Sequence, residues 1–150
     1  LIIGYGNPLR GDDGAGYALA SILALYESAD VHVIAAHQLT PELADDISQT
    51  QHVIFIDAVA ASTSDQTATI TQFINVPATA FNTDHERIAS HATSPEALLA
   101  LSHRLYGRHP TATIITIPAF DFSLGERISA KTEKAMHEAY HYIVDQVKHA

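Results

Sequence analysis

One stretch of the sequence decides the fold: Gly4-Tyr5-Gly6-Asn7-Pro8-Leu9-Arg10-Gly11-Asp12-Asp13-Gly14-Ala15-Gly16. It follows a short apolar run and precedes a segment with helical apolar spacing, so it predicts the loop between a first strand and a first helix. Its glycines let the backbone adopt positive φ angles and let other groups approach closely. Open α/β sheets bind ligands at the carboxyl ends of their strands, so this loop marks the expected edge of a functional site.

The two adjacent carboxylates of this loop argue against a nucleotide-binding site. Gly4-x-Gly6 begins like a dinucleotide fingerprint, but Leu9 stands where the third glycine is needed, and no Walker A lysine follows. Asp12 and Asp13 at a helix start would also repel a phosphate bound there. We expect Asp12 to cap the helix or to serve as a structural acceptor. Asp13 is the better candidate for contacting a cation or transferring a proton.

Composition narrows the class of protein. At 150 residues, the chain predicts one domain spanning residues 1–150. It has no cysteine, which excludes disulfide scaffolds, thiolate metal sites and cysteine nucleophiles. The net charge is −9 and the eight Lys and Arg residues do not cluster, so we expect no nucleic-acid partner. No apolar run approaches the roughly 20 residues of a spanning helix, so we expect no membrane partner. We expect a cytoplasmic monomer, with which the absence of cysteine is compatible.

The remaining pattern alternates strands and helices. Strands are predicted at residues 1–5, 31–36, 53–56, 67–76 and 113–117, and helices at residues 15–27, 40–50, 94–107 and 129–148. The connection into residues 67–76 is too short for a crossover helix, so that strand should be antiparallel and near an edge of the sheet. The fold class is therefore α/β: a three-layer α/β/α sandwich on a mixed, mostly parallel sheet of about five strands.

Local signals place the helix ends. Thr40-Pro41-Glu42 and Ser94-Pro95-Glu96 each combine a cap, a first-turn proline and an acid. Ser129 should cap the last helix, and Gly107 should end the one before it. The helix that starts near Ser94 should bury three leucines, Leu98, Leu101 and Leu105, and the last helix should bury Met136, Tyr140, Ile143 and Val147. One helical turn is expected within residues 84–88.

Three polar side chains fall where elements begin or end. Asp13 lies in the first loop, Asp57 ends the most apolar strand, and His91 precedes the helix start at Ser94. If the first and third strands are adjacent, Asp13 and Asp57 share one edge of the sheet. Two carboxylates and an imidazole could hold a divalent metal such as Zn, Ni, Fe or Mn. The alternatives are that Asp57 anchors a loop and that His91 is a surface histidine.

Weaker candidates lie at the same predicted edge. His37 and Gln38 follow the second strand, Glu42 opens the next helix, and Asp121 follows the last strand. A serine hydrolase is not indicated, because the chain has no Gly-x-Ser-x-Gly elbow.

Taken together, the ordered motifs resemble those of the hydrogenase maturation endopeptidases. The resemblance rests on Gly4-x-Gly6-Asn7-x-Leu9-x-x-Asp12-Asp13-Gly14-x-Gly16, His37-Gln38-Leu39-Thr40-Pro41-Glu42-Leu43, Phe55-Ile56-Asp57-Ala58, Ser90-His91-x-x-Ser94-Pro95-x-x-Leu98-Leu99, Leu105-Tyr106-Gly107 and Phe122-x-x-Gly125. These motifs cover nearly the whole chain in order. The glycine-rich motif alone is moderately specific, whereas the ordered set is a strong signal.

The resemblance implies a fold and an activity. The fold is a single α/β/α domain with a mixed sheet. The activity is removal of a C-terminal extension from the large-subunit precursor of [NiFe] hydrogenase after nickel insertion. The bound nickel is the recognition feature and comes with the substrate, and no organic cofactor is expected. The metal-contacting positions of the family fall on Asp13, Asp57 and His91 of this chain, which are its predicted catalytic and metal residues.

Several alternatives remain open at this level. A metal ion could polarise the scissile carbonyl or activate a water, or a carboxylate could act as a general base. A metal-binding assembly protein that recognises the same precursor without cutting it would carry the same residues. A generic nucleotide-binding α/β domain is disfavoured by the missing third glycine and the paired aspartates.

Overall fold

A five-stranded sheet with strand order β2-β1-β3-β5-β4 forms the centre of the molecule. The computed structural model describes residues 1–62, 64, 67, 69–73, 94–108 and 110–149. The strands are β1 (Ile2–Tyr5), β2 (Val33–Ala36), β3 (His52–Ala60), β4 (Thr69–Phe73) and β5 (Thr111–Ala119). β1, β2, β3 and β5 run parallel, while β4 pairs antiparallel with β5 at the edge. The antiparallel direction of β4 agrees with the prediction made from the short connection between it and β3.

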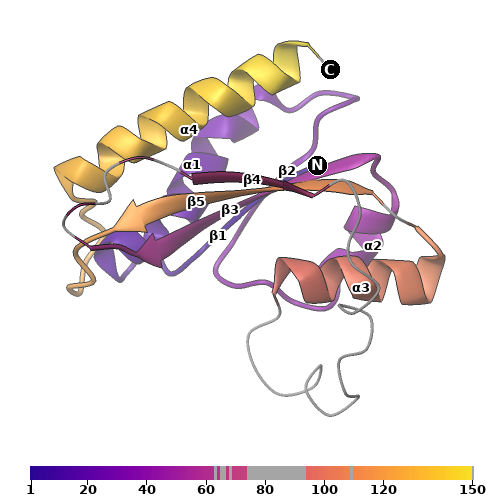
Figure 1. Cartoon of the computed structure of the whole chain (residues 1–150), viewed down its shortest axis with the longest axis horizontal. Helices are drawn as coiled ribbons and strands as arrows, with labels where there is room; N and C mark the ends of the chain where they lie inside the picture. The colour runs from indigo at the N-terminus through magenta and orange to yellow at the C-terminus, as the bar shows by residue number, and fades with distance from the viewer. Residues whose placement is uncertain (63, 65–66, 68, 74–93, 109, 150) are drawn as a thin grey trace.

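Helices cover both faces of the sheet (Figure 1). The helices are α1 (Ala15–Leu23), α2 (Leu43–Ser48), α3 (Pro95–Tyr106) and α4 (Ala130–Lys148), and two 3₁₀ segments, η1 (Gly11–Gly14) and η2 (Ala24–Tyr26), flank α1. α1 and α4 pack on one face, and α2 and α3 lie on the other. Within the described residues, no helix combines the length and the apolar character needed to cross a membrane.

The alternation of side chains along β3 divides the core into two clusters. Ile54 and Ile56 belong to the core under α1 and α4, whereas Val53 and Phe55 belong to the core under α2 and α3. Because side chains of a strand alternate between faces, Asp57 follows Phe55 onto the side of α2 and α3. Asp57 therefore lies on the face of the sheet that α2 and α3 cover, and these helices are the ones that border the candidate site.

Three of the predicted helix ends are correct. Ala97 N donates to Ser94 Oγ (3.1 Å), and Thr132 N donates to Ser129 Oγ (3.4 Å), so both serines are N-caps. Gly107 ends α3 in the left-handed conformation, with φ of 67°.

The predicted cap at Thr40 is wrong, because α2 begins only at Leu43. Leu43 N donates to Thr40 O, and Ala44 N donates to Pro41 O, both at 3.1 Å. These bonds span three residues, so the chain makes tight turns here before it becomes an α-helix. The backbone carbonyls, rather than the Thr40 hydroxyl, accept the first amide protons.

The buried faces of the helices differ partly from the predicted ones. Leu105 is 60% exposed, because α3 turns Leu98, Leu99 and Ser102 toward the sheet instead. In α4, Met136 and Ile143 are buried as predicted, while Tyr140 and Val147 are half-buried.

β3 and β5 are longer than predicted. β3 continues beyond Asp57 to Ala60, where the sequence predicted a loop, because its pairing with β5 extends to Val59↔Pro118 and Ala60↔Ala119. Pro118 has no amide proton to donate to a neighbouring strand. It is tolerated in β5 because the pairing of β5 with β4 reaches only to Thr116. The helical turn predicted within residues 84–88 lies outside the described residues.

Glycine allows α1 to lie directly on the strand ends. A Cβ on Gly16 would lie 2.4 Å from Ile56 O and 2.5 Å from Tyr5 O, both of them backbone atoms that cannot rotate away. We expect Gly16→Ala to lower the free energy of unfolding by about 2–3 kcal/mol through overpacking, measured by urea denaturation. Gly107→Asn is the control, since nothing lies within 4 Å of its Cβ position and asparagine tolerates its φ. Equal losses in both variants would contradict the packing argument.

Candidate functional site

The first loop brings Asp13 over the carboxyl end of β1. Gly6 has φ of 143°, and a Cβ on it would lie 2.0 Å from Asp13 O, so only glycine permits this approach. Asn7 N donates to Asp13 Oδ2 at 3.0 Å, which closes the loop on itself. The Asp13 side chain remains half-buried. The loop therefore presents a carboxylate at the carboxyl edge of the sheet, as predicted.

Asp57 reaches the same edge from β3. The register pairs Gly4 with Ile56, so Tyr5 and Asp57 stand one residue further along two neighbouring parallel strands. The Tyr5 hydroxyl and the Ala58 amide lie near enough to the Asp57 carboxylate to lower its pKa. Asp57 is half-buried, lies inside the strand, and does not end it. Tyr5 and Asp57 are therefore neighbours across these two strands.

Electrostatics link the two aspartates. Burial raises the pKa of Asp57, the nearby Tyr5 hydroxyl and Ala58 amide oppose this effect, and the charge of Asp13 raises the pKa further. The net result is a pKa above the usual value for aspartate. A half-buried carboxyl group whose pKa is raised is a stronger base than an ordinary aspartate and suits proton transfer.

The start of α3 borders this pair. Burial raises the pKa of Tyr5, and the nearby Asp57 carboxylate and the charge of Glu96 raise it further. Glu96 lies in the first turn of α3. The first turn of this helix is therefore within electrostatic reach of the Tyr5–Asp57 pair.

His91 lies outside the described residues, so its predicted place beside the two aspartates stays a prediction. Among the residues that the structure describes, no group of three or more His, Asp and Glu side chains is arranged to hold a metal ion. The described part of the chain therefore brings two of the predicted residues, Asp13 and Asp57, within electrostatic reach of each other.

Asp12 is a structural acceptor and not the cap of its own helix. It is completely buried, and its carboxylate accepts hydrogen bonds from Phe120 N and Asp121 N, both at 2.9 Å. It also accepts from Ser129 N (2.6 Å), Ser129 Oγ (2.7 Å) and Thr132 Oγ1 (2.7 Å). The first loop is thereby fastened to residues 120–129 and to the start of α4. Neither η1 nor α1 has a side-chain cap of its own.

These hydrogen bonds decide the protonation state of Asp12. Burial by itself would raise the pKa of this carboxyl group, but the bonds from Ser129, Phe120 and Thr132 outweigh it and hold the pKa below its usual value. Asp12 is consequently an ionised anchor, while its neighbour Asp13 is left to face the edge of the sheet.

The weaker candidate site residues all lie exposed at the surface. His37 packs its ring edge-on against Tyr17, with centroids 5.4 Å apart, and Gln38 is exposed. A hydrogen bond from its own backbone amide and one from the Thr40 side chain lower the pKa of the exposed Glu42. Asp121 is exposed and accepts from Ser123 N at 2.9 Å.

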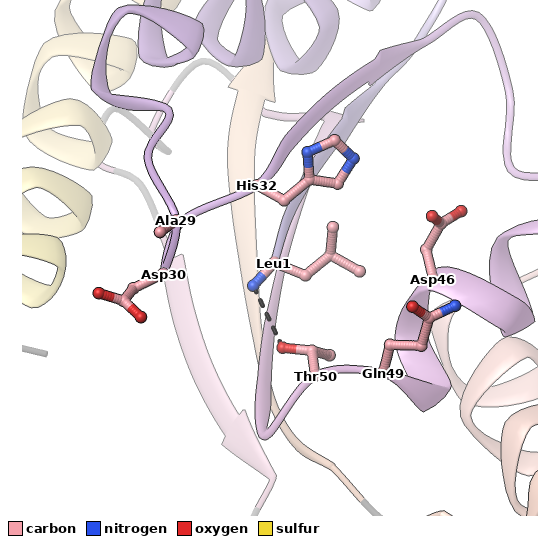
Figure 2. A pocket seen from close by; sticks show the side chains of 7 residues that line it. All are labelled: Leu1, Ala29, Asp30, His32, Asp46, Gln49 and Thr50. Carbon is pink, nitrogen blue, oxygen red and sulfur yellow. Dashed lines mark hydrogen bonds between the residues drawn. The ribbon is translucent and has the colours of Figure 1, made fainter.

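A polar pocket lies at the opposite edge of the sheet, where the strands begin (Figure 2). It is lined by Leu1, Ala29, Asp30, His32, Asp46, Gln49 and Thr50. The amino group of Leu1 donates to Thr50 Oγ1 at 3.4 Å, the bond drawn in the figure. This pocket contains none of the predicted site residues, and α/β sheets bind their ligands at the other edge.

Comparison with solved structures connects this arrangement to known proteins. The chain superposes on the [NiFe] hydrogenase maturation protease HycI of Thermococcus kodakarensis with a TM-score of 0.72 and 20% identity, covering 98% of this chain and 90% of that one. The hydrogenase 2 maturation peptidase of a Thaumarchaeota archaeon gives 0.67 and 24%, with coverage of 98% and 96%. The maturating endopeptidase HybD of E. coli gives 0.65 and 19%, with coverage of 99% and 91%. This chain has the hydrogenase maturation protease fold.

The match is one of structure. No protein-family model matches the chain, and no curated protein matches it in sequence. The hydrogenase maturation protease fold nevertheless accounts for nearly the full length, so the fold implied by the sequence motifs is confirmed.

Sequence reasoning did not single out Tyr5. It occupies a variable position between two glycines of the first motif, where no residue type is demanded. The available signal was positional: Tyr5 is the last residue of a strand adjacent to the strand that carries Asp57.

Proposed function

We propose that this protein is an endopeptidase that removes a C-terminal extension from the nickel-loaded large-subunit precursor of [NiFe] hydrogenase. The observation that carries the proposal is the pairing of Asp13 and Asp57 at the carboxyl edge of a sheet with the hydrogenase maturation protease fold. Solved proteins of this fold are named as peptidases of hydrogenase maturation. The precursor is the expected partner, and the protein acts on it in the cytoplasm as a monomer.

Asp13, Asp57 and His91 contact the nickel that the precursor carries. Carboxylate and imidazole groups are suitable ligands for Ni²⁺. The two aspartates leave coordination positions for the ligands that the precursor supplies. This contact places the scissile bond at the edge of the sheet and makes nickel insertion the condition for cutting. The metal belongs to the substrate, and this chain needs no organic cofactor.

As the alternative to activation by the metal, Asp57 moves a proton while its carboxylate is not bound to nickel. In the metal-free protein its pKa is raised, which makes it a stronger base than an ordinary aspartate. In the proposed reaction a water molecule adds to the scissile carbonyl, Asp57 takes the proton that the water loses, and the proton passes to the leaving amine. Asp13 contributes negative charge beside Asp57 and thereby maintains the basicity of Asp57.

The experiment that tests the activity separates cutting from binding. The purified protein is mixed with nickel-loaded precursor, and the mass of the large subunit is followed by mass spectrometry together with gel filtration. A loss of mass equal to the extension supports the endopeptidase. A stable complex in which the subunit keeps its full mass overturns the peptidase and identifies a non-cleaving assembly protein.

A further inference from the structure

A metal-binding motif lies on the last helix, outside the candidate site. The residues His137-Glu138-Ala139-Tyr140-His141 form the H-E-x-x-H pattern, in which two histidines four residues apart bind zinc from one face of a helix. They lie inside α4, which extends from Ala130 to Lys148. About one helical turn therefore separates His137 from His141 and places both on the same side of the helix.

Both histidine side chains are exposed to solvent. α4 buries Met136, Ala139 and Ile143, which leaves His137 and His141 on its outer side. The centroids of the two rings are 6.3 Å apart, and the ring planes are tilted by 39°. Within the described part of the chain, neither imidazole takes part in a hydrogen bond. The ring nitrogens are therefore available to a ligand that arrives from solvent.

The motif does not form the centre of a zinc peptidase. Such a centre uses three protein ligands, and the described residues offer no group of three His, Asp or Glu side chains arranged around one ion. The pair is also separate from the candidate site. His137 lies about 12 Å along α4 from Ser129, and α4 covers the face of the sheet opposite to that of Asp57. His137 and His141 are therefore a two-ligand site of their own.

We propose that His137 and His141 together bind one divalent transition-metal ion on the surface of α4, with water completing its coordination. Imidazole nitrogen suits Zn²⁺, Ni²⁺ and Cu²⁺, whereas Mg²⁺ and Ca²⁺ prefer oxygen ligands. Exposed side chains change rotamer readily, so the two rings can close on one ion while the backbone stays in place. Glu133 and Asp145 lie one turn before and one turn after the pair, where their negative charge attracts a cation and the charge of Lys134 offsets part of this attraction. The site does not depend on the proposed peptidase activity.

Nickel chloride is the probe for this site. It is titrated into the 150-residue chain without an affinity tag, and binding is followed by isothermal titration calorimetry. We expect His137→Ala and His141→Ala each to weaken binding at least about 10-fold, because the two imidazoles bind one ion as a chelate. The double variant should bind little more weakly than either single variant, since two residues that act as a unit are not additive. Alanine favours a helix, so circular dichroism should show that all variants remain folded.

His149→Ala is the matched control. His149 is also exposed and follows the end of α4, but its Nδ1 is hydrogen-bonded to Asp145 O at 2.7 Å. We expect this variant to keep the wild-type affinity for nickel. Asp57→Asn separates the two sites: the nickel bound by α4 should remain, whereas any nickel bound at the carboxyl edge of the sheet should be weakened.

A second measurement locates the ion. Paramagnetic Cu²⁺ in substoichiometric amount broadens the NMR signals of nearby nuclei, so the signals of His137 and His141 should disappear first. Broadening confined to residues outside α4, or equal nickel affinity in the wild type and both histidine variants, would overturn the site. So would the absence of nickel and copper binding up to about 1 mM, which would identify the pair as solvated surface histidines. The peptidase activity is decided separately, by the cleavage assay.

Discussion

Replacing Asp12 with alanine is expected to lower the free energy of unfolding by about 3–5 kcal/mol, the largest loss of stability that we predict for this chain. The substitution leaves five hydrogen-bond donors around a buried site without their acceptor: three backbone amides and the hydroxyls of Ser129 and Thr132. Some of these donors have no access to water, so the cost of burying them unsatisfied adds to the lost bonds. Urea denaturation monitored by circular dichroism measures the difference.

Asp121→Ala is the matched control for Asp12→Ala. Asp121 belongs to the same pair of loops, but it is exposed, and within the described part of the chain its carboxylate accepts hydrogen bonds only from Ser123 N and Ser123 Oγ. We expect its replacement to change stability by less than about 1 kcal/mol. A loss below that value for Asp12→Ala as well would refute the role of Asp12 as the anchor of the loops.

The stability that Asp12 provides should depend on pH in a defined direction. The folded-state pKa of Asp12 lies below the ordinary value of 3.8. A depressed folded pKa means that the contribution is fully present above the unfolded pKa and is lost as the pH falls through the folded pKa. The difference in unfolding free energy between wild type and Asp12→Ala should therefore be constant from pH 5 to 7 and shrink below about pH 4. A difference that grows on acidification would contradict this assignment.

Replacing Asp57 with asparagine is expected to abolish most of the activity without a loss of stability. A general base contributes typically about 10²- to 10⁴-fold, so the rate of precursor cleavage should fall at least about 100-fold. The folded-state pKa of Asp57 is raised, so its ionised form opposes folding at neutral pH, and removal of the charge relieves repulsion from Asp13. The unfolding free energy should be unchanged or slightly higher, as measured by the same urea titration.

Asp45→Asn provides the control for Asp57→Asn. Asp45 is an exposed residue of α2 that bonds to Gln49, away from the proposed site. We expect it to leave the cleavage rate at the wild-type value. If Asp57→Asn also retained full activity, Asp57 would not be the base. If it unfolded, the structural alternative in which Asp57 anchors the loop would be favoured instead.

The order of elements could be predicted from the sequence because its signals are local. Ser94 and Ser129 cap helices through amides three residues away, and Gly107 ends a helix through its own φ. The antiparallel direction of β4 followed from chain length, since too few residues separate it from β3 for a crossover. These features need no knowledge of distant partners.

The features that the sequence did not predict depend on distant residues. Asp12 resembles a helix cap locally, but its partners are 108 to 120 residues further along the chain. β3 extends beyond Asp57 because β5 continues beside it, which no pattern within residues 53–60 indicates. Tyr5 could be recognised as a neighbour of Asp57 only when the register of β1 and β3 was known.

Part of the candidate site could be predicted from the sequence. Asp13 and Asp57 could be placed together because parallel strands bring their carboxyl ends to one edge. The sequence also predicted that Asp12 is a cap or a structural acceptor and that Asp13 faces the site. The structure shows that Asp12 accepts hydrogen bonds from the loop before α4 and does not cap its own helix. The role of His91 remains a prediction that the cleavage assay can test with His91→Ala.

The most direct test of the central claim compares two forms of the precursor. The wild-type protein is incubated with nickel-loaded and with nickel-free large subunit, and the released C-terminal peptide is quantified by mass spectrometry over time. Our account predicts release from the nickel-loaded form and none from the nickel-free form. Equal release from both forms would contradict recognition through nickel, and no release from either would contradict the peptidase itself.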